Sequence, residues 1–277
     1  MTALITGGSS GLGLEFARQL FDRGYSLILV SNREDELASA AEEISPRASL
    51  GRDDSIVISS DPDVISSEVE KSPSVTTLCM DLARTSAADG LFEWCSSQGI
   101  LPDIIVNDAG MFFFKELSVE DLPRVQAMID LHVVTVTRIC ILFGDAMKKR
   151  GSGRILNISS MCARIPAPGI TIYSATKAYL RSFGRSLSYE LKPHGVTVTT
   201  VCPAAVATPL YRLSERQMRA GLRLGLVRTP RWLVRRSLRA LLRGRRVISP
   251  AFMNLWLPFL IALLPGPLIA RLWKKLK

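Results

Sequence analysis

The chain has 277 residues, of which 47% are hydrophobic and 22% are charged, and it carries five cysteines. This length suffices for one large α/β domain. The cysteines are odd in number and share no disulfide-like or metal-ligating spacing. We therefore expect reduced thiols in a cytoplasmic setting and no metal site. The start, MTALITGG, lacks a basic region and a cleavage site, which predicts no signal peptide.

The net charge of +10 is unevenly distributed along the chain. Residues 1–211 hold 19 Lys/Arg and 24 Asp/Glu, a net of −5, whereas residues 212–277 hold 16 Lys/Arg and one acid, a net of +15. A basic segment that leads into an apolar one favours an anionic membrane surface as partner. Nucleic acid is the alternative partner for a basic segment. No nucleic-acid-binding module is recognisable in the sequence, so the chain is not expected to bind nucleic acid.

Short apolar runs alternate with helical stretches along most of the chain. Runs rich in β-branched residues predict strands at 2–6, 26–30, 75–80, 103–106, 154–159, 196–201 and 246–249. Helical patterns lie between them, at 11–23, 34–45, 85–99, 118–150, 172–193 and 230–243. This alternation predicts an α/β fold, a doubly wound parallel sheet of about seven strands with helices on both faces.

One catalytic domain is expected over 1–249, followed by a hydrophobic, basic-ended tail over 250–277. Residues 46–74 are Ser-rich and acidic where a short connection is usual, which favours an inserted surface loop. The alternative is a small added hairpin or partner site with SIVIS as one strand. Residues 209–245 are expected to form a substrate lid and basic helices.

The stretch TGGSSGLG, at 6–13, follows the first predicted strand and opens a helix. Gly7 permits a tight turn, and Gly11 and Gly13 let the helix N-terminus approach a pyrophosphate closely. A glycine-rich turn between a strand and a helix is typical of a dinucleotide-binding loop. The predicted loop contacts are Gly7, Ser9, Ser10, Gly11, Leu12 and Gly13.

The spacing TGxxxGxG resembles the short-chain dehydrogenase/reductase family, whose fold is Rossmann-like, and the resemblance runs in order to about residue 210. NDAG, at 107–110, resembles the family's NNAG turn with Asp108 as the second residue. PAAVAT, at 203–208, resembles its PGxxxT segment beside the nicotinamide, with Ala204 replacing Gly. Asp81 matches an acidic residue that meets the adenine. The resemblance implies cofactor contacts from Asp81, Leu82, Asn107, Ala109, Gly110, Pro203, Val206 and Thr208.

The end of the second predicted strand bears on the choice between NADP(H) and NAD(H). NAD specificity usually needs a carboxylate there to hold the ribose hydroxyls. The sequence instead reads Ser31, Asn32 and Arg33, and a guanidinium pairs well with a 2′-phosphate. NADP(H) is therefore favoured over NAD(H). The alternative for Arg33 is a solvated residue at a helix start.

Ser160, Tyr173 and Lys177 have the spacing of the family's Ser–Tyr–Lys set. Tyr173 and Lys177 are four residues apart and share a helix face. A free phenol has a pKa near 10, and a nearby ammonium favours the phenolate. By resemblance, Lys177 also binds the nicotinamide ribose and Ser160 binds the substrate oxygen. Tyr173 is then the general acid/base of a hydride-transfer reaction.

His132 stands where the family carries a fourth catalytic residue, an Asn that helps to hold a water in a proton relay. A histidine can also hold water and pass protons, so relay duty is predicted. The alternative is a hydrogen-bonded packing histidine with the relay rebuilt.

The segments expected to line the substrate cleft carry little charge. They include three consecutive phenylalanines at 112–114, and the predicted substrate contacts are Phe112, Phe113, Pro166 and Leu210. Apolar walls suit a ketone or alcohol on a lipid-like or steroid substrate, although at least one of the phenylalanines is expected in the core. The whole chain resembles bacterial family members with basic, hydrophobic ends, some acting on 3-ketosphinganine and others on hydroxysteroids. The alternative function is a cofactor-binding sensor or scaffold with impaired catalysis.

The tail carries no charge from Ala251 to Ala270. That length could span a membrane, but Pro258, Pro265 and Pro267 interrupt it. Two short apolar helices in one leaflet are expected, so that residues 228–277 hold a cytoplasmic enzyme on the inner membrane face. The alternative is that the apolar residues cover a partner in a homo-oligomer or cover the lid.

Overall fold

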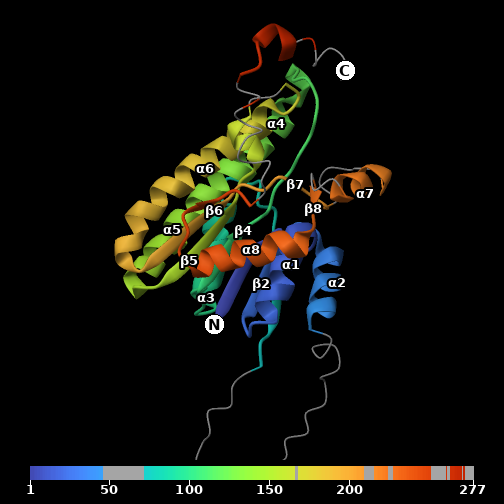
Figure 1. Ribbon diagram of the computed structural model, residues 1–277. Coiled ribbons are helices and arrows are strands. Elements are labelled where there is room, and N and C mark those ends of the chain that lie inside the picture. The colour runs from blue at the N-terminus through green and yellow to red at the C-terminus, as the bar shows by residue number, and fades with distance from the viewer. Residues whose placement is uncertain are drawn as a thin grey trace, which may run out of the picture.

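The short aliphatic runs form one parallel sheet in the order β3-β2-β1-β4-β5-β6-β9 (Figure 1). The computed structural model describes residues 1–45, 72–165, 168–208, 215–223, 227–250, 260, 263–269 and 271. The sheet's strands are β1 (Thr2–Thr6), β2 (Ser26–Ser31), β3 (Val75–Cys79), β4 (Ile104–Asn107), β5 (Gly153–Ile158), β6 (Val196–Val201) and β9 (Val247–Ile248). The predicted doubly wound sheet of about seven strands is confirmed.

Helices cover both faces of the sheet, and each face has its own apolar core (Figure 1). One layer holds α1 (Gly11–Phe21), α2 (Glu34–Ile44) and α8 (Pro230–Leu242). The other holds α3 (Ala87–Ser97), α5 (Val136–Arg150) and α6 (Thr171–Leu191). Strands covered on both faces need continuous apolar sequence, and all four residues of β4 are buried.

The strand order reverses between β1 and β4, which pair in parallel from Ala3–Ile104 to Thr6–Asn107. In open α/β sheets a ligand crevice forms at such a reversal, outside the carboxyl ends of the strands. The glycine loop follows β1, and the NDAG turn follows β4. The topology therefore places the glycine loop and the NDAG turn side by side at the carboxyl edge of the sheet.

The helix expected over 118–150 is continuous but not uniform. It begins with a 3-10 turn (Val119–Asp121), continues as α4 (Leu122–Ile129), passes through a π-helical stretch (Asp130–Thr135) and ends as α5. Among the described residues it is the one helix long and apolar enough to cross a membrane, by length and composition only, and half of its apolar window is buried. Its buried residues pack on α3, α6 and the sheet, as a core helix does.

Three small elements were not given bounds in advance, although the first of them lies within 209–245, where a substrate lid and basic helices were expected. They are α7 (Glu215–Arg223) and the two-residue strands β7 (Ala205–Val206) and β8 (Val227–Arg228), which pair in parallel. Two 3-10 turns also occur, at Met161–Arg164 and Lys192–His194. The hairpin alternative with SIVIS lies outside the described residues, as do most of the 46–74 insertion and much of the tail.

Candidate active site

Tyr173 and Lys177 lie one helical turn apart near the start of α6, where it faces the carboxyl edge of the sheet. Both are buried, with 4% and 5% of their surface exposed. The Lys177 ammonium donates to the carbonyl of Ile158 at 3.0 Å and lies 5.7 Å from the centroid of the Tyr173 ring. The last carbonyl of β5 thus holds the Lys177 ammonium beside the buried phenol of Tyr173.

Ser160 follows β5 and is also buried. Its hydroxyl oxygen accepts from the backbone N–H of Cys162 at 3.1 Å, which caps the 3-10 turn after the strand. The neighbouring Ser159 donates to the carbonyl of Lys177 at 2.7 Å and so ties the turn to α6. Cys162 packs in the same apolar cluster as Tyr173. The structure therefore brings the Ser160 turn against the helix that carries Tyr173 and Lys177.

Asp108 and Lys177 influence each other's charge. Burial lowers the pKa of Lys177 to about 8, and the negative charge of Asp108 opposes this shift. Burial raises the pKa of Asp108 to about 7, while the Lys177 ammonium and the Gly13 N–H favour its ionised form. Each of these two side chains, one after β4 and one on α6, therefore favours the charged form of the other.

The glycine loop is built for close backbone approach. Gly7 has a φ of +71°, and a Cβ there would lie 2.9 Å from the Cα of Ala109. A Cβ at Gly13 would overlap the carbonyl of Gly7. Ser10 precedes α1 without making a side-chain cap, so the first N–H groups of the helix remain suited to an anion. These features fit a dinucleotide pyrophosphate.

Other predicted cofactor residues surround this loop. The hydroxyl of Thr6 accepts from the N–H groups of Asp108 and Ala109, at 3.1 and 3.2 Å, which fixes the turn after β4. Thr208 is 3.7 Å from the position a Cβ would take at Gly11. The structure therefore gathers the loops after β1, β4 and β6 around one crevice.

The loop after β6 is tied to the loop after β5. The carbonyl of Pro203 accepts from the N–H of Met161 at 2.8 Å, and Val206 is buried in β7. Two other predicted cofactor residues follow β3. Asp81 is exposed and accepts from the N–H of Ala83 at 3.0 Å, whereas Leu82 is buried.

Asn107 has a side chain that serves the sheet. Its amide donates to the Asn157 side chain on β5 at 2.8 Å and is almost fully buried. Gly110 follows in the turn, and a Cβ there would lie 3.1 Å from Nε2 of His132. The backbone of the turn thus reaches the crevice, while the Asn107 side chain points into the fold.

A carboxylate that was not predicted from the sequence lies close to the end of β2, in the helix that follows. Glu36, in the first turn of α2, accepts from the Ser9 hydroxyl at 3.2 Å. The Ser9 hydroxyl oxygen also lies 3.0 Å from the hydroxyl of Ser31. Arg33 is largely exposed and forms an ion pair with the same Glu36. The predicted guanidinium and an unpredicted carboxylate therefore share the place expected for the cofactor's ribose.

His132 lies in the π-helical stretch and is fully buried. Its Nε2 accepts from the N–H of Met111 at 3.0 Å, and its Nδ1 lies 3.0 Å from the Thr176 hydroxyl. Thr176 donates its own proton to the carbonyl of Tyr173 at 2.9 Å, so Nδ1–H is the donor to Thr176. Burial, with a smaller contribution from Lys177, lowers the pKa of His132 well below its usual range. Both ring nitrogens are engaged, which favours the packing alternative over relay duty.

Apolar side chains surround Tyr173. Phe112 meets its ring edge-to-face, with centroids 5.0 Å apart. Phe113 is buried beside Met128 and carries the Arg124 guanidinium 4.5 Å from its ring centroid. Phe113 is thus largely core, as expected for at least one of the three phenylalanines. The other predicted substrate residues, Pro166 and Leu210, lie outside the described residues.

The chain is similar in sequence and in fold to known proteins. The sequence model of the short chain dehydrogenase family matches residues 1–61 and 56–219. The very-long-chain 3-oxoacyl-CoA reductase of Bos taurus is 31% identical over 217 residues, 77% of this chain and 62% of that protein. The 17-beta-hydroxysteroid dehydrogenase type 3 of Danio rerio is 27% identical over 213 residues, 75% of this chain and 61% of that protein.

The chain thus spans less than two thirds of the length of these curated relatives. Among solved structures, a short-chain dehydrogenase from Sphingobium yanoikuyae in complex with NADPH has a TM-score of 0.72 at 25% identity, covering 96% of each chain. The two chains therefore share their fold over nearly their whole lengths.

Proposed function

Because the chain belongs to the short-chain dehydrogenase family, we propose that it is an NADP(H)-dependent oxidoreductase that interconverts a ketone and a secondary alcohol on a hydrophobic substrate. The observation that carries the proposal is the buried Tyr173–Lys177 pair beside a glycine loop. A ketone needs a proton on its oxygen as hydride reaches its carbon, and a buried phenol beside a cation can deliver it.

The residues of the chain have separate tasks in this reaction. When bound, the nicotinamide supplies or accepts the hydride. Tyr173 gives a proton to the substrate oxygen during reduction and takes it back during oxidation. The Lys177 ammonium, held by the Ile158 carbonyl, stabilises the tyrosinate that proton donation leaves. The Ser160 hydroxyl orients the substrate oxygen.

Residues already described would hold the cofactor. The loop from Gly7 to Gly13 would receive the pyrophosphate at the start of α1. The turn at Ala109, the segment near Thr208 and the side chain of Lys177 would receive the nicotinamide half. On the adenosine half, preference for NADP(H) rests on Arg33, whose guanidinium must leave Glu36 to meet a 2′-phosphate.

The apolar wall around Tyr173 supports a lipid-like or steroid substrate. Phe112 packs directly on the tyrosine ring, and Met111, Val125 and Ile170 belong to the same cluster. A small acid or sugar would need converging polar groups, and this wall supplies few. The relatives from Bos taurus and Danio rerio are named for 3-oxoacyl-CoA and 17-beta-hydroxysteroid chemistry, which are both ketone–alcohol reactions on apolar skeletons.

Association of residues 228–277 with a membrane surface is part of the proposal. Three of the four described leucines of the tail are exposed: Leu260 by 47%, Leu263 by 64% and Leu268 by 41%. Residues 266–269 are helical, with Leu268 and Ile269 bonded back to Pro265, so a helical turn begins within LPGP. A homo-oligomer in which these leucines cover a second copy is the alternative.

The test measures NADPH consumption with ketosphinganine, 3-oxoacyl thioester and ketosteroid substrates, in the wild type and in Tyr173→Phe. Loss of the proton donor should lower turnover by about 100- to 10,000-fold, with NADPH affinity nearly unchanged. Tyr189→Phe is the matched control, because Tyr189 lies on the same helix but is 49% exposed. Near-normal turnover in Tyr173→Phe would refute the mechanism. NADPH binding without turnover of any ketone would favour a cofactor-binding scaffold.

A further inference from the structure

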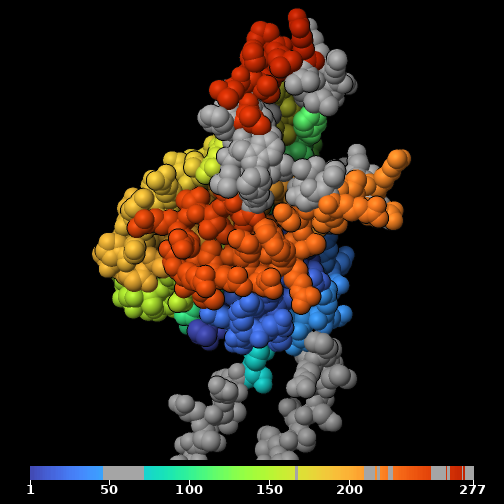
Figure 2. Space-filling view, in the orientation of Figure 1, coloured from blue at the N-terminus to red at the C-terminus, as the bar shows by residue number. Residues whose placement is uncertain are grey.

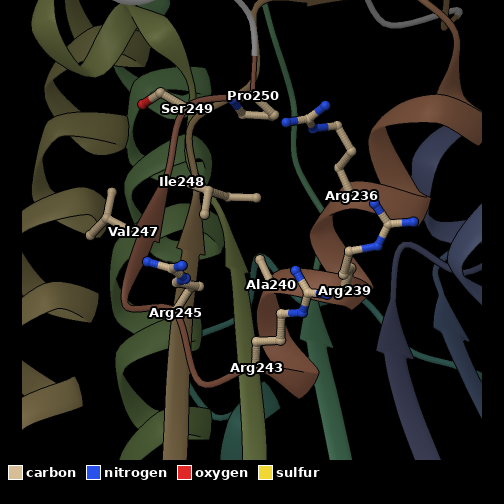
Figure 3. A pocket seen from close by; sticks show the side chains of 9 residues that line it. All are labelled: Arg236, Arg239, Ala240, Arg243, Arg245, Val247, Ile248, Ser249 and Pro250. Carbon is tan, nitrogen blue, oxygen red and sulfur yellow. The ribbon is translucent and has the colours of Figure 1, made fainter.

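A cavity of about 370 Å³ lies between the C-terminal half of α8 and β9 (Figure 3). Its lining contains no residue of the catalytic or cofactor groups described above. The lining residues are Arg236, Arg239, Ala240, Arg243, Arg245, Val247, Ile248, Ser249 and Pro250. Four of these nine residues are arginines, and none is acidic.

The four arginines come from two sides of the cavity. Arg236, Arg239 and Arg243 project from α8 and its last turn, whereas Arg245 lies on the chain that leads into β9 (Figure 3). The last acidic residue of the sequence is Glu215. None of the ion pairs and side-chain hydrogen bonds found among the described residues involves any of the four guanidinium groups. Four positive charges therefore share one cavity without a carboxylate from the described part of the chain.

The end of α8 does not use these side chains as caps. Gly244 has a φ of +64°, its N–H bonds the carbonyl of Leu241 at 3.0 Å, and the N–H of Arg245 bonds the carbonyl of Ala240 at 2.9 Å. This pair of backbone bonds is the Schellman pattern, which satisfies the last carbonyls of a helix. The arginine side chains are therefore left for another partner.

Neighbouring arginines have aromatic partners of their own. Arg246 lies 4.3 Å from the ring centroid of Tyr189, and Arg228 lies 5.0 Å from that of Trp232. Within the cavity, Arg236 also lies over Trp232, at 5.1 Å. Arg239, Arg243 and Arg245 have no aromatic contact among the described residues. The cavity thus concentrates four guanidinium groups that have no carboxylate partner among the described residues, and three of them also have no aromatic partner there.

We propose that Arg236, Arg239, Arg243 and Arg245 bind a phosphate group. Like charges gathered in one hollow repel each other and attract an anion. The guanidinium fork matches phosphate oxygens bidentately. The cavity has room for a small organic group attached to the phosphate, and Ala240, Val247, Ile248 and Pro250 offer apolar contact for it. The ligand is an anionic lipid headgroup or a soluble phosphate ester, and the site does not depend on the ketone chemistry.

The test compares two double variants that remove the same charge. Arg239→Gln/Arg243→Gln changes the cavity, and Arg231→Gln/Arg235→Gln changes exposed arginines of the same helix that do not line it. Calorimetric titration with sn-glycerol 3-phosphate is run on the full chain saturated with NADPH. The bound cofactor keeps the glycerol phosphate out of the proposed pyrophosphate site. Sedimentation with phosphatidylcholine vesicles, with and without phosphatidic acid, tests the lipid source.

The cavity variant should bind glycerol 3-phosphate about tenfold or more weakly, because charged hydrogen bonds are lost. The control variant should change the affinity for glycerol 3-phosphate by less than about twofold. Both variants should keep the wild-type Tm and NADPH affinity. Saturable binding of glycerol 3-phosphate supports a soluble ligand, and selective binding of phosphatidic acid vesicles supports a lipid. Equal losses in both variants, or no saturable binding of either probe, would overturn the proposal.

Discussion

Asp108 gives Lys177, the lysine of the proposed mechanism, a charged neighbour at a turn where the family pattern carries asparagine. The carboxyl lies between the N–H of Gly13 and the Lys177 ammonium, and each charge supports the other. The proposed mechanism needs Lys177 protonated, because an uncharged amine would not stabilise a tyrosinate. Asp108 therefore extends the pH range over which the site can act.

Replacing Asp108 by Asn should move the alkaline limb of the activity profile to lower pH. The pKa of Lys177 is about 8 with Asp108 present, and the charge of Asp108 raises it. Without that charge the pKa falls, so Lys177 loses its proton at lower pH and turnover declines earlier. Turnover against pH, at saturating NADPH, measures the shift. An unchanged alkaline limb would show that Asp108 does not act on Lys177.

The same variant has a second readout, in stability. Burial raises the pKa of Asp108 from 3.8 to about 7, so between these values the unfolded chain has lost a proton that the folded chain keeps. The free energy of unfolding contributed by this group is present below pH 3.8 and is lost as the pH rises to about 7. Asp108→Asn should therefore gain Tm over the wild type across this window and hold a constant gain above it.

Arg33 and Glu36 should act in opposite directions on cofactor choice. Arg33→Ala removes the group proposed to meet the 2′-phosphate and should narrow the gap between NADPH and NADH affinity. Glu36→Gln removes a carboxylate that competes for Arg33 and would repel the phosphate, so it should widen the gap. Charge-assisted bonds of this kind contribute about 1.5–3 kcal/mol, roughly tenfold or more in affinity. Fluorescence titration with NADPH and with NADH measures the difference in affinity. An equal difference in the wild type and both variants would show that Arg33 does not bind the 2′-phosphate.

At the scale of elements, His132 connects three parts of the active site. It lies in the π-helical stretch, holds the turn after β4 through Met111, and holds α6 through Thr176. Thr176 stands immediately before Lys177 and bonds the backbone of Tyr173. The histidine is therefore a positioning residue for the proton donor, and its neutral, Nδ1-protonated form suits both bonds.

His132→Leu should lower turnover by about 100-fold, because small displacements of reacting groups have effects of this size. His132→Asn should retain much of the activity, since an amide can still donate and accept. KM for the ketone and NADPH affinity should change less than turnover in both variants. If the two variants lose turnover equally and slightly, His132 only fills space.

The sequence predicted the elements well where one physical pattern dominates. The expected strand at 196–201 matches β6 residue for residue, because VTVTTV is a short β-branched run between glycine and proline. The predicted helix at 118–150 was right in extent. Its 3-10 and π-helical parts were not visible, because stretches of three and six residues are too short to set an apolar spacing of their own. The two-residue strands β7 and β8 exist only through their pairing with each other.

Candidate site residues were predictable where spacing along the chain encodes the contact. Tyr173 and Lys177 share a helix face, and the glycine loop joins a strand to a helix. Glu36 was missed because its contact with Ser9 spans 27 residues and depends on how α2 packs. The basic segment was visible in the sequence, but which four arginines share a cavity depends on the turn at Gly244.

At the scale of the whole molecule, the arginine-rich segment of α8 and the exposed leucines of the tail lie in different parts of the surface. In Figure 2, α8 and the following segment form a band over the face that also carries α1, while the described tail residues lie at the far end beyond α4. That end carries the start of α6 and the apolar cluster around Tyr173 (Figure 1). A lipid surface that met the tail would thus lie on the substrate side of the domain.

Truncation after Pro250 should weaken binding to vesicles with and without anionic lipid, while the arginine cavity of α8 and β9 keeps its lining. The tail supplies exposed leucines and further basic residues, and each basic residue near an anionic surface contributes about 1 kcal/mol. Leu260→Ser/Leu263→Ser/Leu268→Ser tests the apolar part alone, because its charge is that of the wild type. Co-sedimentation with neutral and anionic vesicles is measured for all three proteins, with NADPH turnover on a soluble ketone as the control for folding. Equal partitioning of the three, with the full chain alone forming a stable dimer, would contradict membrane association and assign the leucines to a partner subunit.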